Sequence, residues 1–234
     1  MNSKERVLRS IDHREVDRCP YYYFATRATN EALRKHLQIS ASDGDIAERL
    51  GCDVQYIGPR LIVGDGPRPP IFQAGSVHAV LYDKTGKQIK QALPLEEATT
   101  VEEVHEYPHW PSPDSYEYEL PASRRQALHD KAVVAYDMGI VFLYAMGMRG
   151  IENIMIDMAG DPDMAHAIFH RIAAFNLERT RRFLAANPGV IDMVVLGDDV
   201  AGQDGLLLSP AMWREYLKPH LEAMVQLCRE FDVF

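Results

Sequence analysis

The chain has 234 residues, of which 47% are hydrophobic and 25% are charged, and its formal net charge is -9 at pH 7. This length suits one domain with a sizeable core, and the composition is that of an ordinary soluble globular protein. The negative charge argues against a nucleic-acid partner, which needs a basic surface, and no apolar run approaches the roughly 18–20 residues of a membrane span.

The N-terminus and the cysteines favour a cytoplasmic location. The first ten residues, MNSKERVLRS, are charged and lack the apolar region of a signal peptide. Cys19, Cys52 and Cys228 are scattered, odd in number and without Cys-x-x-Cys spacing. This usage suits a reducing compartment, and it predicts no metal site within this chain.

The first half of the chain predicts short alternating elements. Asn2 with Glu5 resembles a helix-capping pair. The expected helices are at residues 2–11, 29–37 and 42–50, and the expected strands are at residues 20–24 and 54–57. An excursion rich in glycine and proline follows at residues 58–75, a β-hairpin at 77–93 and a proline-rich connector at 107–121. We place no domain boundary there, so residues 1–234 form a single domain.

The second half alternates apolar strands with longer helices. A long helix begins at Asp161-Pro162 and ends near Ala186, and its apolar face carries Met164, Ile168, Ile172 and Phe175. Further helices are expected at residues 122–129, in the segment MRGIENIMIDMAG, and from Ser209-Pro210 to about Arg229 with a bend near Pro219; strands are expected at 132–136, 192–196 and 231–234. This alternation is typical of a parallel sheet in an α/β protein.

Polar residues follow three of these strands. In parallel α/β folds, ligands bind beyond the carboxyl ends of the strands. Arg27 follows the first strand, Asp137 a middle one, and Asp198 and Asp199 a later one. The acids could bind a cationic group or act as general acid or base, and the arginine could grip a carboxylate. Alternatively, the acids cap the turns that follow their strands, and the arginine is solvated.

The other candidate motifs give weaker indications of a functional site. His166 and His170 have the spacing of a two-histidine metal face, but no HExxH glutamate accompanies them, so packing or solvated histidines are favoured. The tyrosines at 21–23 are expected to form core packing with one ring lining a site. The sequence contains no glycine-rich phosphate loop and no G-x-S-x-G serine-hydrolase motif.

Three segments resemble the uroporphyrinogen decarboxylase superfamily: ERVLRSIDHREVDRCP, RGIENIMIDMAGDPDMAHAI and LGDDVAGQDGLLLSPAMWREYLKPHL. The resemblance spans essentially the whole chain, in order. It implies a (β/α)8 TIM-barrel fold, of which this chain would supply about four strands and an N-terminal excursion with a β-hairpin. The superfamily includes cofactor-free decarboxylases, zinc-dependent methyltransferases that take a methyl group from a corrinoid, and members of unassigned role.

Two departures separate the chain from authentic uroporphyrinogen decarboxylases. Their arginine-rich stretch after the first strand is replaced by FATRATNEAL, in which only Arg27 matches. Their catalytic aspartate would fall near Pro59-Arg60, and no acid occurs there until Asp65. The resemblance is therefore nearer to the unassigned and corrinoid-methyltransferase-like members.

The resemblance also implies that the domain is incomplete at its C-terminus. The zinc ligands of the methyltransferases would lie past Phe234, so this chain alone is expected to bind no cofactor. An incomplete barrel exposes a strand edge and one wall of its core, so a homodimer is expected, and the truncated chain could be inactive.

Three functions stay open at this point. The first is transfer of a methyl group from a corrinoid protein to a thiol or pterin acceptor in a full-length form. The second is decarboxylation of uroporphyrinogen or a related acid, and the third is a non-catalytic fragment. The small-molecule site is expected to use Asp198 and Asp199 as catalytic residues and Arg27, Tyr22, Asp137, Tyr144 and Gln203 for substrate binding.

Overall fold

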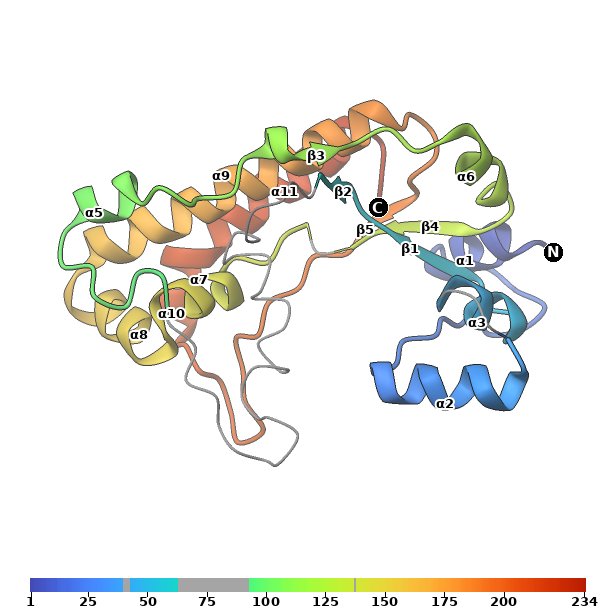
Figure 1. Ribbon diagram of the computed structural model, residues 1–234, viewed down its shortest axis with the longest axis horizontal. Helices are drawn as coiled ribbons and strands as arrows, with labels where there is room; N and C mark the ends of the chain where they lie inside the picture. The colour runs from blue at the N-terminus through green and yellow to red at the C-terminus, as the bar shows by residue number, and fades with distance from the viewer. Residues whose placement is uncertain (40–42, 63–92, 137) are drawn as a thin grey trace.

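The computed structural model describes residues 1–39, 43–62, 93–136 and 138–234. Its elements alternate between short strands and helices along an elongated molecule (Figure 1). The helices are α1 (Ser3–Ile11), α2 (Arg27–Leu37), α3 (Asp43–Arg49), α5 (Val101–Glu106), α6 (Ala122–Ala127), α7 (Phe142–Arg149), α8 (Ile151–Gly160), α9 (Pro162–Ala186), α10 (Pro210–Met212) and α11 (Lys218–Glu230), with a 3-10 turn η3 (Pro113–Ser115) and a π-helical turn η4 (Trp213–Leu217). The strands are β1 (Val54–Ile57), β2 (Arg60–Leu61), β3 (Tyr116–Glu117), β4 (Ala132–Ala135) and β5 (Met193–Val194).

A small parallel sheet organises the fold. Its strand order is β1-β4-β5, with Val54 opposite Ala132 and Val134 opposite Met193. The predicted parallel α/β sheet is thus confirmed, but the described residues form an open sheet of three strands and no complete barrel. The antiparallel pair β2-β3 stands apart from it.

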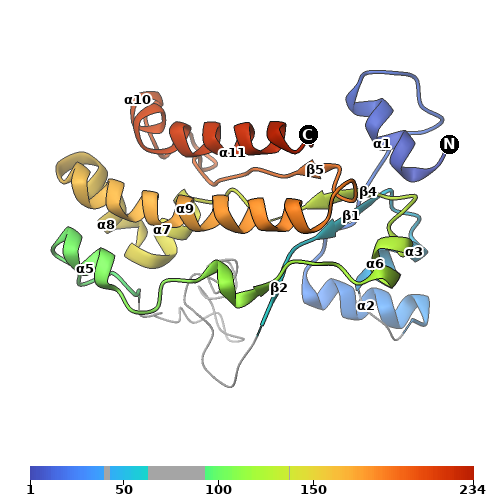
Figure 2. The same cartoon turned by 90° about the horizontal axis from the view of Figure 1, so that it is seen from above.

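One face of the parallel sheet is covered by helices. Alternate side chains Ile57, Val133, Ala135 and Val194 are buried in a cluster with Phe183 and Leu184 of α9 and Cys228 of α11. Figure 2 shows α9 and α11 running side by side along the sheet. Successive strand residues point to opposite faces, and the neighbours Tyr56, Tyr136 and Val195 are 36%, 47% and 39% exposed. The second face is therefore partly open at its carboxyl end.

A second cluster surrounds the first half of α9. It joins α7, α8 and η4 to α9 and includes Phe142, Ile154, Phe169 and Tyr216. The apolar face predicted for the long helix is confirmed, because Met164, Ile168, Ile172 and Phe175 are all buried. The N-cap positions are also confirmed, since the side chains of Asn2, Asp161 and Ser209 accept bonds from the first turns of their helices.

Two predicted strands are wrong. Residues 20–24 are extended but form no strand, because their backbone is joined to Asp53 at Tyr21 alone and not by a ladder of backbone bonds. The Tyr21 N–H donates to Asp53 Oδ2 at 3.1 Å, and the Asp53 N–H donates to the Tyr21 carbonyl at 2.9 Å. Residues 231–234 begin with a turn, and only Phe234 bonds to β5, through Asp192 O and Val194 N.

The other differences are smaller. The bend expected near Pro219 takes the form of the π-helical turn η4 immediately before α11, in which Pro219 occupies the first turn and needs no N–H acceptor. The hairpin predicted at residues 77–93 lies outside the described residues, apart from Leu93.

Candidate functional site

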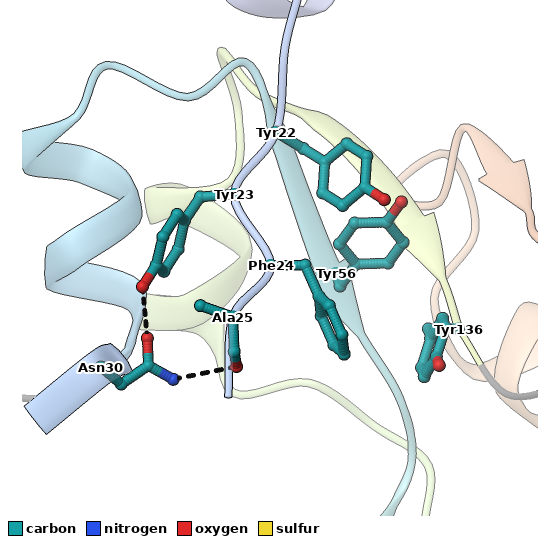
Figure 3. Close-up of a pocket in the computed structure, with 7 residues that line it drawn as sticks. All are labelled: Tyr22, Tyr23, Phe24, Ala25, Asn30, Tyr56 and Tyr136. Carbon is teal, nitrogen blue, oxygen red and sulfur yellow. Dashed lines mark hydrogen bonds between the residues drawn. The ribbon is translucent and has the colours of Figure 1, made fainter. Parts of the chain in front are cut away.

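An aromatic pocket lies where the first extended segment, β1 and β4 end. It has a volume of about 310 Å³ and is lined by Tyr22, Tyr23, Phe24, Ala25, Asn30, Tyr56 and Tyr136. Figure 3 shows Tyr23 and Asn30 on one side of it and the rings of Phe24, Tyr56 and Tyr136 on the other. We call this the aromatic pocket below.

Three tyrosines form a ladder along one wall. The ring centroids of Tyr22 and Tyr56 are 5.2 Å apart with planes at 67°, and those of Tyr56 and Tyr136 are 5.5 Å apart at 84°. Such edge-to-face pairs are favourable because the positive ring edge meets the negative ring face. Burial, and then the neighbouring Tyr22 and Tyr136, raise the pKa of Tyr56. The Tyr56 phenol therefore keeps its proton at neutral pH.

The opposite wall is fixed by hydrogen bonds to Asn30 of α2. The Tyr23 hydroxyl donates to Asn30 Oδ1 at 2.6 Å, and Asn30 Nδ2 donates to the Ala25 carbonyl at 3.4 Å. Asn30 is buried, and Thr26 caps α2 through a bond from the Thr29 N–H. These bonds hold the segment before α2 against the helix.

A second cavity adjoins the aromatic pocket and shares Tyr56 and Tyr136 with it. Its volume is about 270 Å³, and its lining includes Gly58, Met138 and Arg179. Arg179 is buried on α9, and its guanidinium carbon lies 5.6 Å from the Tyr116 ring centroid and 5.2 Å from that of Phe175. The sequence analysis missed this arginine, whose position on the buried face of the long helix was the available signal.

Asp198 caps a helix from across the fold. Its carboxylate accepts the backbone N–H groups of Val141 (2.9 Å), Phe142 (2.5 Å) and Leu143 (2.8 Å) at the start of α7. Burial raises the pKa of Asp198, and these hydrogen bonds oppose the rise. The geometry favours a structural role for this acid, but at the start of α7 and not in the turn after its own strand, where the alternative interpretation had placed it. Asp198 lines a separate cavity of about 190 Å³ beside Trp213 and Leu217.

The other predicted site residues that the structure describes do not line the cavity beside Asp198. Asp199 and Gln203 are exposed, and Gln203 lies in a tight turn closed by the bridge from Ala201 to Leu206. Tyr144 is 3% exposed, within the helical core. Among the predicted site residues whose side chains the structure describes, only Tyr22 lines the aromatic pocket.

Two of the expected residues cannot be placed. Asp137 and the Arg27 side chain lie outside the described residues, although Arg27 is the first residue of α2.

The expectation for the tyrosines at 21–23 is wrong. None of the three is buried in the core: Tyr21 and Tyr22 are exposed, and Tyr23 is half-buried. Two of them line the aromatic pocket, so they belong to the site more than to the packing. The sequence analysis also missed Phe24 and Tyr56, whose signal was an aromatic side chain at an alternate strand position.

The described histidines and cysteines do not gather into a metal site. Within the described ranges, no group of three or more His, Cys, Asp or Glu side chains could hold a metal ion. The rings of His166 and His170 stack at 5.7 Å, and His166 lies 4.8 Å from the Tyr216 ring. Arg60, at the position that resembles the decarboxylase aspartate, pairs with Glu117 across β2 and β3.

The sequence matches no protein-family model, and no curated protein matches it. No helix in the described part of the chain is both long and apolar enough to cross a membrane.

Proposed function

We propose that this chain is a methyltransferase of the uroporphyrinogen decarboxylase superfamily. It would move a methyl group between a corrinoid carrier and a small acceptor. The aromatic pocket receives the small molecule, and the exposed loop with Asp199 and Gln203 faces the carrier.

The observation that carries this proposal is the character of the pocket lining. The pocket stands at the carboxyl ends of parallel strands, where α/β folds bind ligands. Its described lining is four exposed aromatic rings with Tyr23, Ala25 and Asn30, and it includes no charged side chain. A surface of this kind binds an apolar or soft ligand group better than a polyanion.

This lining disfavours a porphyrinogen with its many carboxylates. Carboxylates are recognised by arginine, which offers paired N–H donors. A decarboxylase substrate would bring several carboxylates to a wall of phenyl and phenol groups and would lose their hydration there. Methyl transfer makes no such demand, because a methyl group is apolar.

The residues have distinct proposed roles. Tyr56 stays protonated, so its hydroxyl can donate a hydrogen bond to a bound acceptor. Asp198 positions α7 and thereby the loop that carries Asp199 and Gln203. The described residues offer no ligand set for zinc, so no step is assigned to a metal here.

The experiment is a methyl-transfer assay with methylcobalamin and a thiol acceptor. Loss of the Co–C bond is followed by visible absorbance, for the wild-type chain and for Tyr56→Leu, with Phe234→Leu as control. Phe234 is an aromatic residue at 59% exposure outside the pocket lining. We expect demethylation by the wild type and the control only. Equal rates with and without protein would overturn the proposal.

Arg179 favours one alternative, decarboxylation of an acidic substrate. Its guanidinium lines the cavity that shares Tyr56 and Tyr136, and there it could hold a single carboxylate. Added uroporphyrin reports on this alternative through its fluorescence. A shift at micromolar porphyrin that Arg179→Met abolishes would support the decarboxylase, and no shift would count against it.

A further inference from the structure

Four aromatic rings surround the aromatic pocket and remain open to solvent. The exposed fractions of Tyr22, Phe24, Tyr56 and Tyr136 are 53%, 78%, 36% and 47%. Exposed apolar groups that gather at one place commonly mark a binding site. The shape and charge of this cluster define which ligand fits.

We propose that the aromatic pocket binds a quaternary ammonium group, a nitrogen cation that carries three methyl groups. This inference rests on the proposed function only in taking the same pocket as the substrate site. It adds the chemical class of the ligand and involves no reaction step.

The angles between the rings favour a rounded group over a flat one. The planes of Tyr22 and Tyr56 meet at 67°, and those of Tyr56 and Tyr136 meet at 84°. Parallel rings would form a slot for a planar ligand, whereas steeply inclined rings form the walls of a corner. In Figure 3 the Phe24 ring stands beside Tyr56 and adds a further wall. A trimethylammonium group presents C–H bonds in several directions and can touch several such walls at once.

The electrostatics of the lining favour a cation. The face of each aromatic ring is electron-rich and attracts a cation that lies over it. None of the described side chains that line the pocket is a lysine, arginine or histidine, so none of them opposes the binding of a cation. The chain as a whole carries a net charge of -9, which adds a weak attraction for cations.

The hydrogen-bonding groups of the pocket favour a methylated cation over a protonated amine. A primary ammonium carries three N–H donors and needs acceptors. None of the described side chains that line the pocket is a carboxylate, and the oxygens of the Asn30 side chain and the Ala25 carbonyl each already accept one hydrogen bond, at 2.6 Å and 3.4 Å, so each offers an ammonium only its second lone pair. A quaternary ammonium has no N–H bond, so it loses no hydrogen bond when it contacts only ring faces.

The test compares two ligands of the same shape and different charge. Choline carries a trimethylammonium group, and 3,3-dimethylbutan-1-ol replaces its nitrogen by carbon. Isothermal titration calorimetry of the whole chain should give choline an affinity about tenfold higher than the neutral alcohol, as expected for cation–π contacts. Equal affinities for the two compounds would overturn the proposal. So would the absence of binding by either compound up to about 10 mM, which is on the order of the weakest Kd that can be measured.

Variants then locate the bound cation. Tyr56→Leu removes the central ring and should weaken choline binding about tenfold, whereas Tyr56→Phe keeps the ring and should bind as the wild type does. Phe234→Leu is the matched control outside the pocket lining. Tyr22→Leu, at a more exposed position, serves if Tyr56→Leu fails to give a cooperative thermal melt. Unchanged choline binding in a folded pocket variant would refute the assignment.

The two proposals can fail separately. Choline binding without demethylation of methylcobalamin would leave the ligand class standing and reject methyl transfer. Demethylation without preference for choline over its neutral isostere would do the reverse.

Discussion

Replacing Asp198 by alanine tests whether this acid is structural. The carboxylate accepts three backbone N–H groups at the start of α7, at 2.5–2.9 Å. In Asp198→Ala these donors lose their partner while Val141 and Phe142 stay buried. We expect a lower free energy of unfolding, with the fold retained.

The magnitude follows from what replaces the carboxylate. Three donors left unpaired away from water would cost roughly 3–9 kcal/mol, at about 1–3 kcal/mol each. The cavity of about 190 Å³ beside Asp198 admits water to these donors. The burial that raises the pKa of Asp198 also reduces what its charge contributes. The loss should therefore lie near the upper limit of ordinary helix capping, about 2 kcal/mol.

Urea unfolding followed by circular dichroism measures this change. Asp199→Ala is the matched control, because Asp199 is the adjacent acid and is exposed; it should change stability by no more than about 0.5 kcal/mol. If Asp198→Ala unfolds at the same urea concentration as Asp199→Ala, the capping role is refuted.

Three further predictions concern stability. The pKa of His220 is lowered from 6.5 to about 4 by burial and by His170 and His166, so the folded chain favours the neutral imidazole. The free energy of unfolding should therefore be highest above about pH 6.5 and fall by up to about 3 kcal/mol towards pH 4, as measured by urea unfolding at a series of pH values. His220→Gln should flatten that part of the profile. Arg149→Met leaves the buried Asp157 carboxylate without its partner at 2.8 Å and should lower the free energy of unfolding by about 3–5 kcal/mol. Adding Asp157→Leu removes the unpaired charge and should recover part of this loss, so no recovery in the double variant would contradict the explanation. Gly150 has a φ of +88°, and a Cβ at this position would lie 2.8 Å from Leu93 Cδ1. Gly150→Ala should therefore lower the melting temperature by an amount equivalent to about 2 kcal/mol. An unchanged melting temperature would show that the turn between α7 and α8 relaxes freely.

The local sequence predicted most helices and their ends. Helix caps depend on residues within three or four positions of one another, so Asn2, Asp161 and Ser209 could be recognised without knowledge of the fold. The apolar face of α9 could be predicted for the same reason, because its spacing of three and four residues is a local property.

Strand pairing was less predictable. Residues 20–24 are aromatic and extended, as strand propensity suggests, yet their backbone is joined to Asp53 at Tyr21 alone and no ladder forms. β-propensity describes the fit to a half-buried surface, and that surface is supplied by distant parts of the chain.

The sequence by itself determined the class of the fold, the positions of most helices and the negative charge of the chain. Only the tertiary structure decided which side chains form a site. It brings Tyr22 and Phe24 to Tyr56 and Tyr136, residues separated by up to 114 positions, because β1 and β4 are paired in parallel and Tyr21 is hydrogen-bonded to Asp53 immediately before β1. It also places the Asp198 carboxylate at the start of α7, where it accepts backbone N–H groups that have no partner within the helix. The sequence had suggested a catalytic role for this acid, because it stands next to Asp199 after a strand.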